Sequence, residues 1–177
     1  SALKQELSQV EKHRELIRSS RARGNMKTAA IVGYTNAGKS TLLNTLTGSE
    51  VLSEDKLFAT LDPTTRLLNL KDGQQILLTD TVGFINKLPH HLVEAFKSTL
   101  EEAKYADIIV HVVDASNPQM DAQMHVVYET LRQLGAEGKP VITLFNKQDK
   151  VENPVNHKDL QADYSLSLIH ISEPTRR

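Results

Sequence analysis

The sequence predicts an α/β fold, a mostly parallel β-sheet with helices on both faces. Short apolar runs, of the length expected for buried strands, alternate with longer stretches that have helical spacing. A glycine-rich turn lies between the first such run and the first helical stretch, which is where open α/β sheets bind ligands. The chain has 177 residues, 39% apolar and 24% charged, which favours one ordinary domain with short appendages.

A long amphipathic helix is predicted ahead of this domain. Residues 2–22 contain no Gly or Pro and place five apolar side chains at roughly helical spacing. We assign residues 1–24 to a helical arm and, because the chain opens at Ser1 without Met, expect it to be the end of an upstream domain. Residues 1–27 hold seven Lys or Arg and three Glu, a charge of +4, so the rest of this −1 chain carries −5. A basic arm fits a polyanionic partner, and a solvated helix face explains it equally well.

The domain itself is predicted to span residues 25–165. Its strands are expected at residues 28–32, 66–70, 76–79, 107–113 and 141–145, and its helices at residues 39–47, 91–104 and 119–134. Residues 71–74 form a hairpin signal, so the second and third strands should be antiparallel. The stretch 48–65 has little apolar periodicity and is long for a connection, and such loops are usually functional.

The last residues, 166–177, resemble the translation of a sequencing adapter. We therefore exclude them from the expected fold as a non-native tail. The natural sequence would then stop near Ser165 and the true protein would continue further; the alternative is a genuine polar tail. The chain has no cysteine, no charged-then-apolar leader and no apolar run of about eighteen residues. Disulfides, a secretory signal and a membrane span lack support, and a cytoplasmic location is the expected default.

The glycine-rich turn satisfies the pattern G-x-x-x-x-G-K-[ST] in the strand-to-helix context that this motif requires. Its glycines let the backbone wrap a phosphate with N–H groups, and the helix N-terminus adds positive potential. The lysine would reach the β- and γ-phosphates and the serine hydroxyl would bind Mg²⁺. The loop predicts a P-loop NTPase and comprises Gly33, Tyr34, Thr35, Asn36, Ala37, Gly38, Lys39, Ser40 and Thr41.

A second element, D-x-x-G, directly follows the strand expected at residues 76–79. Its members are Asp80, Thr81, Val82 and Gly83. At the carboxyl end of a strand beside the phosphate loop, Asp80 can hold a Mg²⁺-bound water and Gly83 can present its N–H to a γ-phosphate. The pattern gains weight from lying about forty residues past the phosphate loop.

A third element, N-K-x-D, ends the strand expected at residues 141–145 with Asn146, Lys147, Gln148 and Asp149. Guanine presents N1–H and N2–H₂ donors on one edge, and the Asp149 carboxylate can accept both, whereas adenine has no matching pair. The three elements together predict a GTPase-type G domain that prefers GTP and GDP to ATP.

Within the long loop, one hydroxyl should complete the Mg²⁺ shell while the γ-phosphate is present and release it after hydrolysis. Thr60, Thr64 and Thr65 are candidates, and spacing alone does not choose among them.

The segments GYTNAGKSTL, FATLDPTTR, LLTDTVGFI, LPHHLVEAFKSTLEE and FNKQD resemble the HflX family of ribosome-associated GTPases over roughly residues 25–150. The resemblance implies GTP hydrolysis linked to binding the large ribosomal subunit and its RNA, with ribosome splitting or rescue under stress. No DNA partner is implied, and we expect a monomer. The resemblance also points to Thr60 as the switch residue that binds Mg²⁺. The expected metal ligands are therefore Ser40, Thr60 and Asp80, and the expected catalytic residues are Lys39, Thr60 and Gly83. The nucleotide-contacting loop would be Phe58, Ala59, Thr60, Leu61 and Asp62.

The residue after Gly83 is Phe84, where Ras-type enzymes carry a water-orienting Gln. The nucleophile must then be positioned by backbone, by a partner or by a second cation. Asn36 is a candidate for binding K⁺ beside the phosphates, and a turn-forming role at unusual backbone angles is equally consistent.

Two other readings remain open. Another small GTPase of tRNA modification or ribosome assembly would share the phosphate loop, and Phe84 leaves room for a catalytically silent nucleotide- or RNA-binding module. His90, His91 and His111 are not spaced as a metal site and are interpreted as surface or satisfied core residues.

Overall fold

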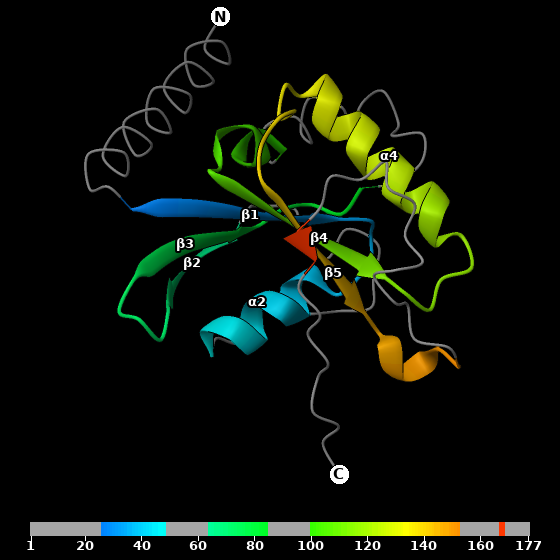
Figure 1. Cartoon of the computed structure of the whole chain (residues 1–177), viewed down its shortest axis with the longest axis horizontal. Helices are drawn as coiled ribbons and strands as arrows, with labels where there is room; N and C mark the ends of the chain where they lie inside the picture. The colour runs from blue at the N-terminus through cyan, green and yellow to red at the C-terminus, as the bar shows by residue number, and fades with distance from the viewer. Residues whose placement is uncertain (1–25, 49–63, 85–99, 153–166, 169–177) are drawn as a thin grey trace, which may run out of the picture.

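The computed structural model describes residues 26–48, 64–84, 100–152 and 167–168. Their strands form one sheet in the order β2-β3-β1-β4-β5-β6 (Figure 1). The strands are β1 (Lys27–Gly33), β2 (Thr64–Asn69), β3 (Gln75–Asp80), β4 (Ile108–Asp114), β5 (Val141–Asn146) and β6 (Ser167–Leu168). The helices are α2 (Lys39–Thr47), α4 (Met120–Gln133) and the 3₁₀ turn η2 (Gln148–Lys150), and residues 100–105 are also helical.

The predicted α/β fold is confirmed. Strand β1 pairs in parallel with β3 and β4, and β4 pairs in parallel with β5. Strands β2 and β3 are antiparallel, joined by the expected hairpin, in which the N–H of Gly73 donates to Leu70 O over 3.0 Å. The sheet is therefore mostly parallel, with β1 at its centre.

Helices α2 and α4 cover opposite faces of the sheet (Figure 1). Successive residues of a strand point to opposite faces, so β1 serves both cores. Ala29 and Ile31 belong to the cluster that contains Leu43 of α2, whereas Ala30 and Val32 belong to the cluster that contains Val127 of α4. Burial on both sides explains why β1 is a continuous apolar run and not an alternating one.

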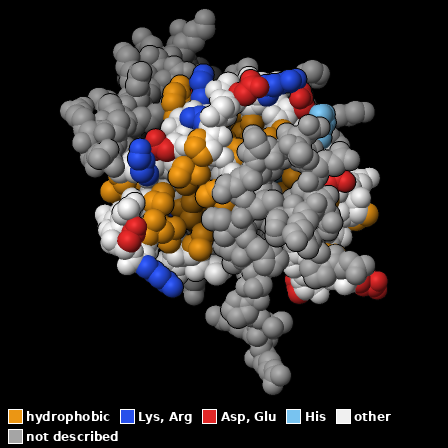
Figure 2. Space-filling model, in the orientation of Figure 1, with side chains coloured by type: hydrophobic (Ala, Val, Ile, Leu, Met, Phe, Trp, Pro, Cys, Tyr) orange, Lys and Arg blue, Asp and Glu red, His pale blue; other side chains and the backbone are white. Residues whose placement is uncertain are grey.

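Figure 2 shows hydrophobic side chains gathered over the region of β1, β3 and α2 on the viewed side of the molecule. The half-buried residues that pack against the α2-side cluster are Leu42, Leu68, Ile76, Ile108 and Val110.

No helix among the described residues is long and apolar enough to cross a membrane.

Most expected bounds hold to within one residue, and two larger departures concern which residues pair in the sheet. Strand β2 begins at Thr64, two residues before the expected start at residue 66, because Thr64 and Thr65 pair with the end of β3. In addition, Ser167–Leu168, expected to stand apart from the fold, pairs with Ile142 and Thr143 as β6. The edge of β5 offers backbone donors and acceptors that any extended segment can satisfy, so this pairing needs no specific sequence.

Several expectations lie outside the described residues. They concern the arm 1–24, most of the loop 48–65 and most of the helix expected at 91–104.

Candidate functional site

The candidate site lies along the carboxyl edge of the sheet. Because β3, β1, β4 and β5 are parallel neighbours, their last residues come together at one edge although they are far apart in sequence. These last residues are Gly33, Asp80, Asp114 and Asn146. All three predicted nucleotide-binding elements therefore meet here.

The phosphate loop is held in a conformation that depends on small residues. Gly38 has φ 99° and Asn36 has φ 59°, both in the left-handed region that side chains rarely adopt. A Cβ on Gly33 would collide with the carbonyl oxygen of Val112, and one on Gly38 with the side-chain amide of Asn146. The loop can therefore approach β4 and the N-K-x-D element only with glycine at these positions. Residues 146–149 are called the guanine-recognition element below, after their predicted role.

Lys39 is the first residue of α2 and is 6% exposed. Its Nζ donates to the Tyr34 carbonyl oxygen over 3.2 Å. Burial lowers the pKa of Lys39 to about 8, although the negative charge of Asp80 opposes this change. A buried ammonium of this kind is favourably placed to pair with phosphate oxygens, which would replace the water that it has lost.

The side chains of Ser40 and Asp80 meet across the site. The Ser40 hydroxyl donates to Asp80 Oδ2 over 2.6 Å, and Asp80 is fully buried at the end of β3. A hydroxyl and a carboxylate supply the hard oxygen atoms that Mg²⁺ prefers, so the residues present fit the predicted metal. The third predicted ligand, Thr60, lies outside the described residues together with the rest of residues 58–62.

The predicted alternatives to Thr60 are part of the sheet. Thr64 and Thr65 belong to β2, and the Thr65 hydroxyl lies 2.9 Å from that of Thr79. The hydrogen bond gives Thr65 a structural role in the β2–β3 pair.

Gly83 is pressed against the phosphate loop. A Cβ at this position would lie 2.7 Å from Thr35 Cα and 3.1 Å from Lys39 Nζ. The adjacent Phe84 donates its N–H to Gly33 O over 3.0 Å and accepts from the N–H of Thr35 over 2.8 Å. These two bonds join the D-x-x-G element to the phosphate loop through the backbone.

Phe84 points into the core and is 3% exposed. The side chains of Thr81 and Val82 are also buried, and the Thr81 hydroxyl donates to Ile31 O over 2.7 Å. Three of the residues around Gly83 thus serve the fold with their side chains, so that any contact they make with a ligand would come from their backbone.

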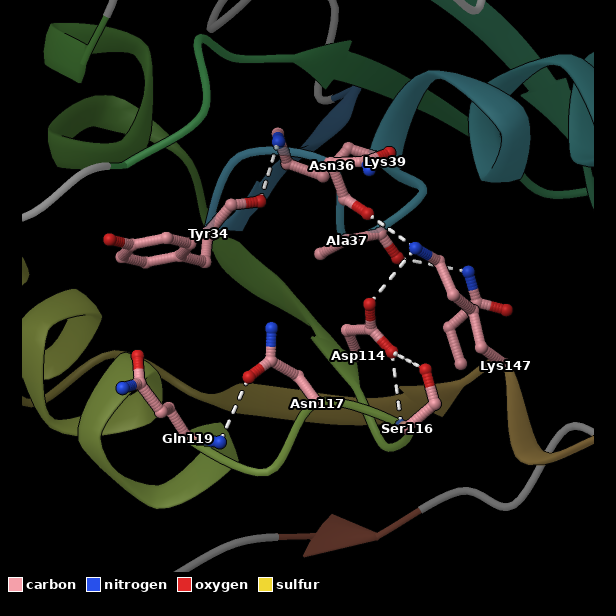
Figure 3. Close-up of polar contacts among 10 residues, drawn as sticks. Tyr34, Asn36, Ala37, Lys39, Asp114, Ser116, Asn117, Gln119 and Lys147 are labelled. Atoms are coloured by element: carbon pink, nitrogen blue, oxygen red, sulfur yellow. Dashed lines mark hydrogen bonds and ion pairs between the residues drawn. The ribbon is translucent and has the colours of Figure 1, made fainter. Parts of the chain in front are cut away.

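The guanine-recognition element is tied to the phosphate loop by two side chains (Figure 3). The amide of Asn146 donates to Ala37 O over 2.9 Å, and Lys147 Nζ donates to Asn36 O over 2.7 Å. Lys147 has φ 60°, and this left-handed turn precedes η2, where the side chain of Asp149 is exposed. An exposed carboxylate is what the predicted contact with guanine requires.

Sequence reasoning missed Asp114, Ser116 and the environment of His111. Asp114 ends β4 and accepts from Lys147 Nζ over 2.9 Å. The sequence could have predicted it, because the carboxyl ends of parallel strands converge. The neighbouring strands β1 and β5 end at Gly33 and Asn146, which belong to the motifs, so the residue that ends β4 should lie between them.

His111 was predicted to be either a surface residue or a core residue, and the structure places it in the core. Its ring packs edge-on against Tyr128 with centroids 5.2 Å apart, and it is 1% exposed. Its Nδ1 has no hydrogen-bond partner among the described residues, so the expectation that a core histidine would be satisfied is wrong at this atom. Burial, aided by the nearby charge of Lys39, lowers the pKa of His111 to about 3, and the ring is neutral.

The fold and this edge define a P-loop nucleotide-binding domain of the G-domain type. Residues 28–147 match the family model described as "50S ribosome-binding GTPase". A protein named GTPase HflX from Lacrimispora saccharolytica is 66% identical over 94% of this chain, and the HflX of Caldanaerobacter subterraneus is 58% identical over 85%. The chain therefore belongs to the 50S ribosome-binding GTPases and, within them, to the HflX family. It spans only 39% and 35% of the length of these two relatives.

Solved structures of other GTP- and GDP-binding proteins have a similar fold. A GTP-binding protein from Sulfolobus solfataricus in complex with GDP is 33% identical, with a TM-score of 0.61 over 84% of this chain and 46% of that one. A variant of S. thermophilus NFeoB bound to GDP and AlF4⁻ gives a TM-score of 0.67 over 82% of this chain and 57% of that one. At 22% identity, the second likeness shows the fold alone.

Proposed function

We propose that this chain binds GTP and GDP with Mg²⁺ at the carboxyl edge of its sheet and hydrolyses GTP to GDP and phosphate. The observation that carries the proposal is that the D-x-x-G and N-K-x-D elements both contact the phosphate loop. Ser40 reaches Asp80, Gly83 abuts Lys39, and Asn146 reaches Ala37. The D-x-x-G and N-K-x-D patterns are weak signals alone, and they gain weight because both contact the phosphate loop.

The chemistry required of the protein is positioning and charge compensation, since phosphoryl transfer needs little covalent help. The N–H groups of the phosphate loop and the N-terminus of α2 would hold the β-phosphate. Lys39 would compensate charge on the β- and γ-phosphates, and the Gly83 N–H would fix the γ-phosphate. Ser40 and Asp80, with Thr60 as the proposed third ligand, would hold Mg²⁺, which supplies neutralisation of the charge that develops during transfer.

Base selection would come from Asp149. Its exposed carboxylate can accept from both donors of the guanine edge, and adenine offers no such pair. Competition against labelled GDP tests this proposal: GTP should displace it and ATP should not. Equal displacement by ATP would overturn the assignment. Asp149→Asn should shift the preference toward xanthine nucleotides, because one acceptor becomes a donor.

A role on the ribosome is suggested by the family to which the chain belongs, and not by contacts in the structure. We propose that the intact protein acts in the cytoplasm on the large ribosomal subunit, and that it splits or rescues ribosomes under stress. Phe84, buried at the position after Gly83, offers no side-chain amide there with which to orient water, so intrinsic hydrolysis should be slow and a partner should accelerate it. Each tenfold in rate corresponds to about 1.4 kcal/mol of barrier.

The test is single-turnover GTP hydrolysis by the intact protein, with and without large ribosomal subunits, in KCl and in NaCl at matched ionic strength. Acceleration by the subunits supports the ribosomal role, and unchanged rates contradict it. Equal rates in both salts would remove the proposed K⁺ role of Asn36, whose left-handed φ of 59° agrees with the turn-forming interpretation. Nucleotide binding without any turnover would identify a silent binding module instead.

A further inference from the structure

Asp114 connects three parts of the site that are far apart in sequence (Figure 3). It is the last residue of β4, which lies between β1 and β5 in the sheet. Its Oδ2 accepts from Lys147 Nζ over 2.9 Å. The same ammonium donates to Asn36 O over 2.7 Å, so one cation links the phosphate loop, the end of β4 and the guanine-recognition element.

The carboxylate of Asp114 is held in one orientation by its own loop. Its Oδ1 accepts from the Ser116 hydroxyl over 2.6 Å and from the Ser116 N–H over 3.0 Å. The turn continues to α4, where the N–H of Gln119 donates to Asn117 Oδ1 over 2.9 Å. Because both oxygens are engaged, the one that faces Lys147 cannot rotate away without breaking hydrogen bonds.

The ion pair is partly shielded from water. The side chains of Lys147 and Asp114 are 20% and 14% exposed. Partial burial alone would raise the pKa of Asp114, but the hydrogen bonds from Ser116 and Lys147 and the ammonium charge outweigh it and lower the pKa below its ordinary value. The carboxylate is therefore charged at neutral pH, and its attraction for Lys147 is stronger than that of a fully exposed pair.

We infer that Asp114 is a positioning residue for nucleotide binding, which acts by holding Lys147 against the phosphate loop. Lys147 lies between Asn146 and Asp149 in the chain, so its position sets the distance between the loop that would hold the phosphates and the carboxylate that would hold guanine. Without Asp114, the ammonium keeps Asn36 O as its one acceptor among the described residues and gains freedom to turn toward water. The inference rests on the proposed function and deepens it, because it names what keeps the two halves of the nucleotide site in register.

The experiment measures dissociation of a fluorescent GDP analogue from this chain in Mg²⁺. Asp114→Asn keeps the size of the side chain and one acceptor oxygen but removes the charge. We expect the analogue to dissociate ~10-fold faster, because a change of this size corresponds to the loss of one charge-assisted hydrogen bond. Glu129→Gln is the matched control, because it makes the same change in an exposed pair with Arg132 on α4. The control should dissociate at the wild-type rate.

A double variant separates positioning from a general loss of structure. In a Lys147→Met background, Asp114→Asn should add less than about a twofold change, because the group through which Asp114 acts is gone. A structural role would add its full effect in either background. If Asp114→Asn does not fold, Ser116→Ala is measured in the same two backgrounds, and it should give a smaller acceleration only when Lys147 is present.

The outcomes distinguish the two proposals. A wild-type chain that fails to retain GDP overturns the proposed function itself. A wild-type chain that retains GDP, with Asp114→Asn dissociating at the wild-type rate or with effects that add in the double variant, overturns only the role of Asp114.

Discussion

The two ends of β4 carry an aspartate each, and the two carboxylates have different tasks. Asp107, just before the strand, accepts from the N–H of Thr28 over 2.8 Å and from its hydroxyl over 3.1 Å. Asp114, at the other end, accepts from Ser116 and from Lys147. The first carboxylate joins β4 to its neighbour β1, whereas the second joins loops that converge on the candidate site. One type of side chain thus supports the fold at the amino edge and, in our proposal, ligand binding at the carboxyl edge.

If this division is real, changes at the carboxyl edge should alter nucleotide chemistry and changes at the amino edge should alter stability. The largest effect is expected for Gly83→Ala. The added Cβ would lie 2.7 Å from Thr35 Cα and must displace the loop that it faces. A displacement near 1 Å at a catalytic site costs about 100-fold in rate, so single-turnover GTP hydrolysis should fall by that order.

Gly73→Ala is the comparison for that variant. Gly73 lies in the β2–β3 turn with φ 83° and nothing within 4 Å of an added Cβ. Strain there should cost about 1 kcal/mol of unfolding free energy and leave hydrolysis unchanged. If Gly83→Ala hydrolyses GTP as fast as wild type, the edge of the sheet is not the catalytic site.

A smaller and more selective effect is expected for Ser40→Ala. In Mg²⁺ the affinity for GTP should fall about tenfold and that for GDP less, because the γ-phosphate shares the ion. In chelator the difference between variant and wild type should shrink. Thr45→Ala removes a hydroxyl from the same helix, where it donates to Thr41 O over 2.9 Å, and should affect both nucleotides equally little. Equal losses of GTP and GDP in Ser40→Ala would refute the metal assignment.

The smallest effect is expected for Asp107→Asn, and it should appear as stability and not as affinity. The hydrogen bond from the Thr28 N–H lowers the pKa of Asp107; desolvation opposes it, but the Thr28 hydroxyl and the nearby Lys27 and Lys139 also favour the charged form, and the pKa stays below its ordinary value. The group is largely exposed, so solvent screening limits the cost to about 0.5–1 kcal/mol.

The pH dependence of that variant has a definite sign. A carboxyl whose folded pKa is depressed stabilises the protein above its unfolded pKa of about 3.9, and the contribution disappears as the pH falls through the lower folded value. Urea unfolding should therefore separate Asp107→Asn from wild type at pH 6 and bring them together in strong acid. A gap that is as wide in strong acid as at pH 6 would contradict the ionic account.

The fold could be predicted because its signals are local. Apolar runs of strand length, a hairpin turn and the strand-to-helix phosphate loop each need only a few consecutive residues, and the succession of strands and helices along the chain followed from them. The start of β2 was missed because Thr64 and Thr65 are polar, and only their pairing with the end of β3 makes them strand. The parallel pairing of Ser167–Leu168 with β5 was missed for a similar reason, since it reflects the open edge of β5 more than its own residues.

The candidate site was predictable as a set of elements and not as a network. The motifs identified Lys39, Ser40, Asp80 and Asn146, yet spacing does not say that Lys147 turns back toward Asn36. That bond depends on the left-handed φ of Lys147 and on the position of β4 between β1 and β5, and both are properties of the folded sheet.

The bonds between the guanine-recognition element and the phosphate loop also set an order of events during synthesis. Asn146 and Lys147 satisfy carbonyl groups of Ala37 and Asn36, which precede them by 109 and 111 residues. A nascent chain that has emerged only as far as β4 has made the phosphate loop but not the side chains that brace it. If the chain binds nucleotide as we propose, a nascent chain should retain it only after Lys147 has emerged from the ribosome, and an intermediate shortened before this residue should hold none.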